Sequence, residues 1–197
     1  MEYRTLGRTG LRVSAVALGC EGFMHKRAEE VKADFDFAIR HGIYSSNPDL
    51  RANIGAALEG RRGEFIIQGH LCTVWENDQY LRTRDPQKSA DSFERQLRQL
   101  RTDYLDVGMI HYVDAEADLR TVFDGPIIRL AQRLKAEGRI RSIGLSSHNP
   151  AVARIASSMR SRAPPWRPSW SAARAARRSK RRWRGAALRP PNATTLR

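Results

Sequence analysis

The chain has 197 residues, 41% of them hydrophobic, which suits one globular domain with an ordinary core. Its net charge of +14 is concentrated at one end, because residues 160–197 hold eleven Arg, one Lys and no acidic residue, which leaves +2 for residues 1–159. Two cysteines, Cys20 and Cys72, are too few for a disulfide framework, a zinc site or an iron–sulfur site, so no metal is expected.

The N-terminus, MEYRTLGRTG, has no apolar core of the kind that a signal peptide requires. No stretch of the sequence approaches the roughly 18 apolar residues of a membrane helix. We therefore expect a cytoplasmic protein that does not bind a membrane.

Strand and helix patterns alternate along residues 1–159, which predicts an α/β fold with a parallel sheet and right-handed crossovers. The second strand is curtailed, because Ile43-Tyr44 runs at once into the turn signal of residues 45–48. The expected elements in chain order are a hairpin at 1–12, a strand at 13–18, a helix at 28–41, the two-residue strand at 43–44, a helix from Pro48 to Gly60, a strand at 65–68, a helix from Asp85 to Leu100, a strand at 105–110, a helix at 119–137 split at Gly125-Pro126, a strand at 140–145 and a helix from Pro150.

The segment from Cys72 to Arg84 is predicted to be a long loop. It contains Trp75 and Tyr80, which could lie over a site.

The strand LDVGMI, residues 105–110, ends directly on His111. Ligands of parallel α/β folds bind at the carboxyl ends of the strands, so His111 is a candidate for chemistry. A hydrogen-bonded structural role is the alternative for such a histidine.

Residues 160–197 contain no Ile, Val, Phe, Tyr, Asp, Glu or Gln. Such a segment buries too little apolar surface to offset its ordering entropy, so we expect a disordered tail after a domain at 1–159. Its Arg and Trp side chains could contact nucleic acid, but a charge run is more often solvated, and we expect nonspecific contacts only.

Three stretches, MEYRTLGRTGLRVSAVALGC, LDVGMIH and GRIRSIGLSSHNP, together resemble the aldo-keto reductase family over about residues 1–155. The resemblance implies a (β/α)8 barrel that transfers hydride from NADPH to a small-molecule carbonyl. In the family a tyrosine gives the proton, an aspartate and a lysine tune it, and a histidine orients the carbonyl.

Under this resemblance, His111 matches the family histidine. His70 stands where the family has its lysine, and an imidazole is largely neutral at pH 7, so it would tune a tyrosine far less. Tyr44 is a candidate for the tyrosine, and no residue matches the aspartate. His70 equally suits loop packing, and Tyr44 equally suits a turn.

The resemblance also assigns cofactor contacts. Ser146 and Ser147 match the pair that contacts the nicotinamide amide, although serines after a strand also cap the next helix. Gly19 and Cys20 match the loop near the nicotinamide ribose.

A complete barrel has eight strands and builds its phosphate site after strands seven and eight, whereas this sequence supplies about five βα units. We therefore expect an incomplete TIM-type barrel and an impaired enzyme. The alternative is a non-catalytic fragment or pseudoenzyme that pairs its open sheet edge with another chain. The sequence assigns no oligomeric state.

The abrupt change near residue 160 predicts that the tail is read in a shifted frame, since its Arg, Ala, Pro and Trp bias is typical of GC-rich codons read out of phase. Translating the nucleotide sequence after codon 159 in the other two frames should restore strand and helix alternation in one of them. Stop codons without alternation in both frames would refute the prediction.

Overall fold

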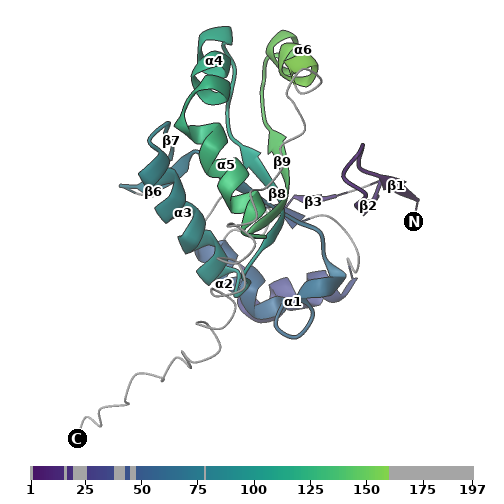
Figure 1. Cartoon of the computed structure of the whole chain (residues 1–197). Coiled ribbons are helices and arrows are strands. Elements are labelled where there is room, and N and C mark those ends of the chain that lie inside the picture. The colour runs from purple at the N-terminus through teal and green to yellow at the C-terminus, as the bar shows by residue number, and fades with distance from the viewer. Residues whose placement is uncertain are drawn as a thin grey trace, which may run out of the picture.

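The computed structural model describes residues 2–15, 17–19, 26–37, 43–44, 48–77 and 79–159 (Figure 1). Residues 160–197, Cys20 and the end of the predicted helix at 28–41 lie outside the described residues. The elements in chain order are β1 (Tyr3–Thr5), β2 (Arg12–Ser14), β3 (Leu18–Gly19), α1 (Ala28–Phe37), β4 (Ile43–Tyr44), α2 (Pro48–Ala57), the short helix η2 (Arg62–Glu64), β5 (Ile67–Leu71), β6 (Thr73–Glu76), β7 (Gln79–Arg82), α3 (Pro86–Gln99), β8 (Leu105–Ile110), α4 (Glu116–Asp124), α5 (Pro126–Ala136), β9 (Ile140–Leu145) and α6 (Pro150–Met159).

The main sheet has five parallel strands in the order β3-β4-β5-β8-β9. Helices α1, α2, α3 and α5 follow one another along its outside (Figure 1). This is the wall of a (β/α)8 barrel, and within the described residues it stops short of closure, with β3 and β9 at its edges. The expected α/β class, the five parallel strands and the two-residue second strand are confirmed.

The C-terminal half matches the predicted elements closely. Strands β8 and β9 have the predicted bounds, and β8 is buried along nearly its whole length because it lies between β5 and β9 under helices. Asp85 caps α3, its carboxylate accepting from the backbone N–H groups of Gln87 and Lys88 at 2.8 and 3.0 Å. Gly125-Pro126 separates α4 from α5 as predicted.

The strand predicted at 13–18 is wrong. Val13 belongs to β2, which pairs antiparallel with β1, and only Leu18–Gly19 joins the barrel sheet as β3. The chain reverses between β1 and β2 at Gly7 and Gly10, whose positive φ angles of 51° and 74° suit glycine. The alternating pattern of the hairpin therefore runs further than residue 12.

The strand predicted at 65–68 is displaced toward the C-terminus. Residues 62–64 form η2, and β5 runs from Ile67 to Leu71, so His70 lies within the strand and not after it. The shift follows from pairing, because β5 keeps register with β8 from Gln68 to Leu71.

The predicted loop at 72–84 is also wrong, since β6 and β7 form an antiparallel hairpin. Asn77 adopts a positive φ of 51° at its turn, a conformation that asparagine tolerates and that two-residue hairpins need.

None of the helices in the described ranges is long and apolar enough to cross a membrane.

The amino end of the sheet is held by a fully buried carboxylate, that of Asp106 on β8. It accepts from Arg62 at 2.9 Å, from Arg141 at 2.8 Å and from the backbone N–H of Ile67 at 2.9 Å. The two guanidinium groups also pack on the Tyr104 ring, at 4.1 and 4.4 Å from its centroid. Asp106 thereby joins the starts of β5, β8 and β9.

Replacing Asp106 by Ala should destabilise the fold by about 3–5 kcal/mol, because it leaves the largely buried Arg62 without its carboxylate. Urea unfolding measures the change. The control is Arg101→Ala, which breaks an exposed ion pair with Glu59 and should cost less than about 1 kcal/mol. Equal losses in the two variants would contradict the assigned role of Asp106.

Candidate active site

Two histidines at the carboxyl edge of the main sheet and one tyrosine of the β6–β7 hairpin gather into a cluster of aromatic side chains. His70 comes from β5, His111 follows β8, and Tyr80 comes from β7. The two imidazole centroids are 3.8 Å apart, and the Tyr80 ring lies 5.9 Å from that of His70 and 5.4 Å from that of His111. The Tyr80 hydroxyl hydrogen-bonds with Nδ1 of His70. Two predicted site residues, His70 and His111, are thus brought together.

Gln96 of α3 fixes the backbone of His70. Its side-chain oxygen accepts from the His70 N–H at 3.1 Å, and its side-chain nitrogen donates to the His70 carbonyl at 2.7 Å. Along a strand, the backbone N–H and C=O groups of successive residues point to opposite sides. The Leu71 carbonyl faces β8, so the N–H and C=O groups of His70 face β4. The described β4 ends at Tyr44, opposite Gln68, and the buried Gln96 amide supplies the partners that a longer β4 would give.

The contact between His111 and Ser146 allows two arrangements of the ring proton. Nδ1 lies 3.3 Å from the Ser146 hydroxyl, which also accepts from the backbone N–H of Tyr112 at 3.3 Å. A hydroxyl group has one proton and two lone pairs, so it can either donate to Nδ1 or accept from it. When the hydroxyl donates to Nδ1, the proton of the neutral ring lies on Nε2.

Nε2 of His111 is a buried ring nitrogen without a partner among the described residues. The residue is 4% exposed, and Nε2 makes no hydrogen bond within the part of the chain that the structure describes. An unsatisfied buried N–H costs about 1–3 kcal/mol, and such groups in native structures are uncommon. Nε2 is available to an oxygen atom of a ligand.

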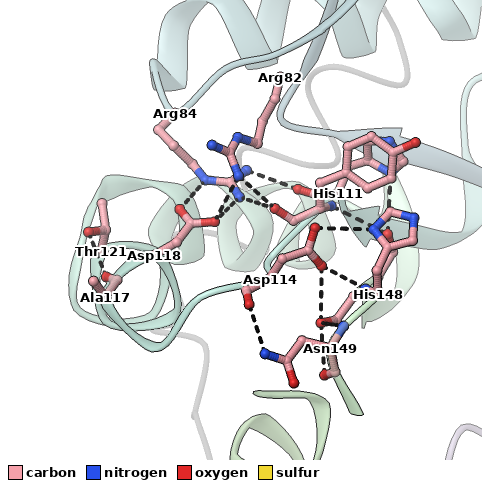
Figure 2. Close-up of polar contacts among 12 residues, drawn as sticks. Arg82, Arg84, His111, Asp114, Ala117, Asp118, Thr121, His148 and Asn149 are labelled. Atoms are coloured by element: carbon pink, nitrogen blue, oxygen red, sulfur yellow. Dashed lines mark hydrogen bonds and ion pairs between the residues drawn. The ribbon is translucent and has the colours of Figure 1, made fainter. Parts of the chain in front are cut away.

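The turn after His111 contains a residue with a strained backbone and accepts hydrogen bonds from two arginines. Tyr112 has a positive φ of 49°, which is unusual for a large side chain, and its ring stacks on His111 with centroids 3.6 Å apart. Its carbonyl accepts from Arg82 at 3.2 Å and from Arg84 at 2.8 Å, and Arg84 also donates to the His111 carbonyl at 3.0 Å. Figure 2 shows both guanidinium groups converging on Asp118, with Arg84 bound at 2.7 and 2.5 Å.

Both histidines are held neutral by their surroundings. Burial lowers the pKa of His70 to about 2, with the charges of His111 and Arg51 adding to the effect. Burial also lowers the pKa of His111 to about 4, helped by His148 and Arg84. At neutral pH the site therefore contains two uncharged imidazoles.

The two serines after β9 play different roles. Ser146 contacts His111, whereas the Ser147 hydroxyl lies 3.2 Å from the Asp114 carboxylate and accepts from the backbone N–H of Asn149 at 3.0 Å. Asp114 also accepts from the backbone N–H of His148 at 2.6 Å, and this bond holds the pKa of its carboxyl below the ordinary value (Figure 2). Ser147 thus helps to order the turn before α6, whereas the helix itself is capped by the Asn149 side chain, which accepts from the backbone N–H of Ala151 at 3.0 Å.

Three other predicted residues are not brought to the histidines by the described contacts. Gly19 lies on β3 and pairs with Tyr44 on β4, but the Tyr44 side chain is outside the described part, as is Cys20. Cys72 is buried, and burial raises the pKa of its thiol. No group of three or more His, Cys, Asp or Glu side chains in the described ranges could hold a metal ion.

Sequence reasoning placed Tyr80 only in a predicted loop that could lie over a site, and it missed Gln96. The hairpin that carries Tyr80 has a local signal, the Asn77-Asp78 pair between two short segments of strand-forming residues. Gln96 has no such signal, since it occupies an apolar-stripe position of α3 and its partner is set by how β5 packs.

The model of the Aldo/keto reductase family matches residues 41–169. Among curated proteins, the chain is similar to an uncharacterized oxidoreductase, YqkF, of Bacillus subtilis (29% identical, covering 77% of this chain and 51% of the relative). It is also similar to the aldo-keto reductase YhdN of the same organism (25% identical, covering 75% of this chain and 47% of the relative). The chain spans about half the length of the curated relatives it matches.

Among solved structures, the chain resembles the holo form of the aldo-keto reductase AKR11C1 from Bacillus halodurans. The TM-score is 0.67 at 23% identity, covering 79% of this chain and 53% of that one. This likeness supports the barrel architecture of the described strands.

The buried histidines predict that acid weakens the fold. In the unfolded chain each imidazole takes up a proton below its ordinary pKa near 6.5, whereas in the folded chain His111 does so only near 4 and His70 near 2. The unfolded state thus binds more protons between these values, so stability falls as pH falls. From about pH 7.5 to about pH 5.5 the free energy of unfolding should drop by roughly 1.4 kcal/mol per histidine.

Urea unfolding at the two pH values measures this drop, in a window where carboxylates are ionised in both states. Changing both histidines to glutamine should remove it. A wild-type chain that is equally stable at the two pH values would show that the histidines are not buried neutral.

Proposed function

The chain belongs to the Aldo/keto reductase family, and on that basis we propose that it is an oxidoreductase that transfers hydride between NADPH and a small carbonyl or alcohol. The observation that carries the proposal is the partnerless, buried Nε2–H of His111 at the carboxyl edge of the sheet. A carbonyl oxygen is a hydrogen-bond acceptor of the kind that this donor lacks.

The described residues suit the nicotinamide end of the cofactor. When the Ser146 hydroxyl donates to His111 and accepts one hydrogen bond from Tyr112, one lone pair stays available for an amide N–H. The Ser147 hydroxyl is already hydrogen-bonded to both Asp114 and Asn149. When bound, NADPH supplies the hydride that reduces the carbonyl carbon.

His111 would orient and polarise the substrate without titrating. Its pKa of about 4 keeps the ring neutral at physiological pH, and the role requires the tautomer in which Ser146 donates to Nδ1 and Nε2 carries the proton. A neutral N–H donates a hydrogen bond to the carbonyl oxygen and stabilises the negative charge that develops there. Stacking on Tyr112 and contact with His70 fix the ring orientation.

Two features favour weak activity. His70, where the family resemblance predicts a lysine, is uncharged at neutral pH with a pKa of about 2, so it cannot supply a positive charge. The (β/α)8 fold also builds its phosphate site after strands seven and eight, and the described sheet has five strands. We infer that NADPH binds weakly.

We predict that the purified chain oxidises NADPH with aldehydes or quinones below about 1 turnover per second, followed by NADPH absorbance at high cofactor concentration. His111→Gln should lower this rate at least tenfold, because it removes the donor to the carbonyl oxygen. The control, Lys135→Gln on the exposed side of α5, should keep the wild-type rate.

A rate at or above about 1 per second that His111→Gln abolishes would contradict the impairment but support the site. A rate that is unchanged in His111→Gln would refute the assignment of this site. Cofactor binding without turnover on any carbonyl would favour the alternative of a non-catalytic family member.

A further inference from the structure

We propose that Tyr80 is the proton donor of this site and that His70 positions its hydroxyl group. The inference rests on the proposed function and deepens it, because it assigns a role for which the sequence offered only Tyr44. Three observations carry it: the Tyr80 hydroxyl bonds to Nδ1 of His70, its ring lies 5.4 Å from that of His111, and His111 presents the buried, partnerless Nε2 in the same cluster.

The hairpin that carries Tyr80 contacts α3 on one side and the turn after β8 on the other. At its base Thr83 N–H donates to the Cys72 carbonyl at 2.9 Å, and Cys72 N–H donates to the Ser89 hydroxyl of α3 at 2.8 Å. Lys88 of α3 pairs with Glu76 at 3.3 Å. These contacts fix the hairpin against α3.

On its other side the hairpin is joined to the turn after β8. Arg82, at the end of β7, and Arg84 both donate to the Tyr112 carbonyl. Trp75 lies directly opposite Tyr80 in the hairpin register, where cross-strand side chains share a face. Tyr80 is therefore held at the histidines by tertiary contacts, as a residue with a defined position must be.

Tyr112 is the other tyrosine near the histidines, and its geometry suits the role less well. Its ring lies face to face with His111, at an interplanar angle of 29°, whereas the Tyr80 ring meets His111 edge-on at 65°. The structure records no hydrogen bond from the Tyr112 hydroxyl to either histidine, and the side chain is 36% exposed. Tyr80 is half-buried and already engaged with His70.

The proton balance of the step is complete. As the carbonyl carbon gains hydride, the π electrons of the C=O bond move onto oxygen, which takes the proton of the Tyr80 hydroxyl to form the alcohol. The O–H bond of Tyr80 breaks and leaves a phenolate, which regains a proton from water once the alcohol has left. His70 remains neutral throughout and acts only through its hydrogen bond with Tyr80.

Tyr80→Phe keeps the ring and removes the acid, so kcat for carbonyl reduction should fall about 100-fold, the lower range of general acid catalysis, while KM stays within about twofold. The solvent deuterium isotope effect on kcat should disappear with it. Tyr104→Phe, which removes a phenol hydroxyl at the opposite end of β8, is the matched control and should leave both quantities unchanged. His70→Gln should shift the pH dependence of kcat, which a residue with only a packing role would not do.

A measurement on the cofactor-free chain tests the contact itself. The nitrogen-15 chemical shift of His70 Nδ1 should move in Tyr80→Phe and not in Tyr104→Phe, because only the first variant removes its hydrogen-bond partner. If Tyr80→Phe misfolds, fluorotyrosine at position 80 makes the phenol more acidic at nearly constant shape and should shift the pH profile of kcat to lower pH.

The outcomes separate this proposal from the proposed function. Turnover that His111→Gln abolishes but Tyr80→Phe leaves intact overturns the proton donor alone. Loss of turnover in Tyr44→Phe or Tyr112→Phe, with Tyr80→Phe active, reassigns the acid to that tyrosine. Absence of NADPH oxidation with every carbonyl in the wild-type chain overturns both proposals.

Discussion

The site depends on how the backbone of His70 satisfies its hydrogen bonds. The described β4 has two residues and ends opposite Gln68, and the N–H and C=O groups of His70, two residues further along β5, are hydrogen-bonded to the Gln96 side chain. Leaving both groups unsatisfied in the interior would cost several kcal/mol. The Gln96 amide from α3 accepts from one and donates to the other, which keeps β5 straight as far as Leu71 and places the His70 ring against that of His111.

The same short strand is the reason that the proposed chemistry draws on other elements. The family scheme draws its tyrosine from the neighbourhood of the second strand, where this chain offers Tyr44 alone. The hairpin after β5 instead carries a phenol to the histidines, and two arginines join that hairpin to the turn after β8. Both ends of the sheet thus use polar contacts between segments distant in sequence, with the buried Asp106 joining three strand starts at the amino end.

Electrostatics distinguish this arrangement from one built on a lysine. Burial keeps both imidazoles uncharged, so under the proposed function a bound oxygen atom would meet neutral donors. Neutral donors stabilise a developing alkoxide less than an ammonium group does, which is the physical reason to expect slow turnover. The strained backbone of Tyr112 and the partnerless Nε2 of His111 both lower the stability of the fold at this edge of the sheet, as is common at functional sites.

The sequence by itself determined the features that depend on local patterns. The buried run of β8 and β9, the Asp85 cap, the Gly125-Pro126 break and the position of His111 after a strand all follow from periodicity and backbone preferences within a few residues. Only the tertiary structure decided the start of β5, the pairing of Val13 in the hairpin and the meeting of His70, Tyr80 and His111. These features depend on the register between strands that are distant in the sequence. A register is set by the hydrogen bonds between two strands, so no single stretch of sequence encodes it.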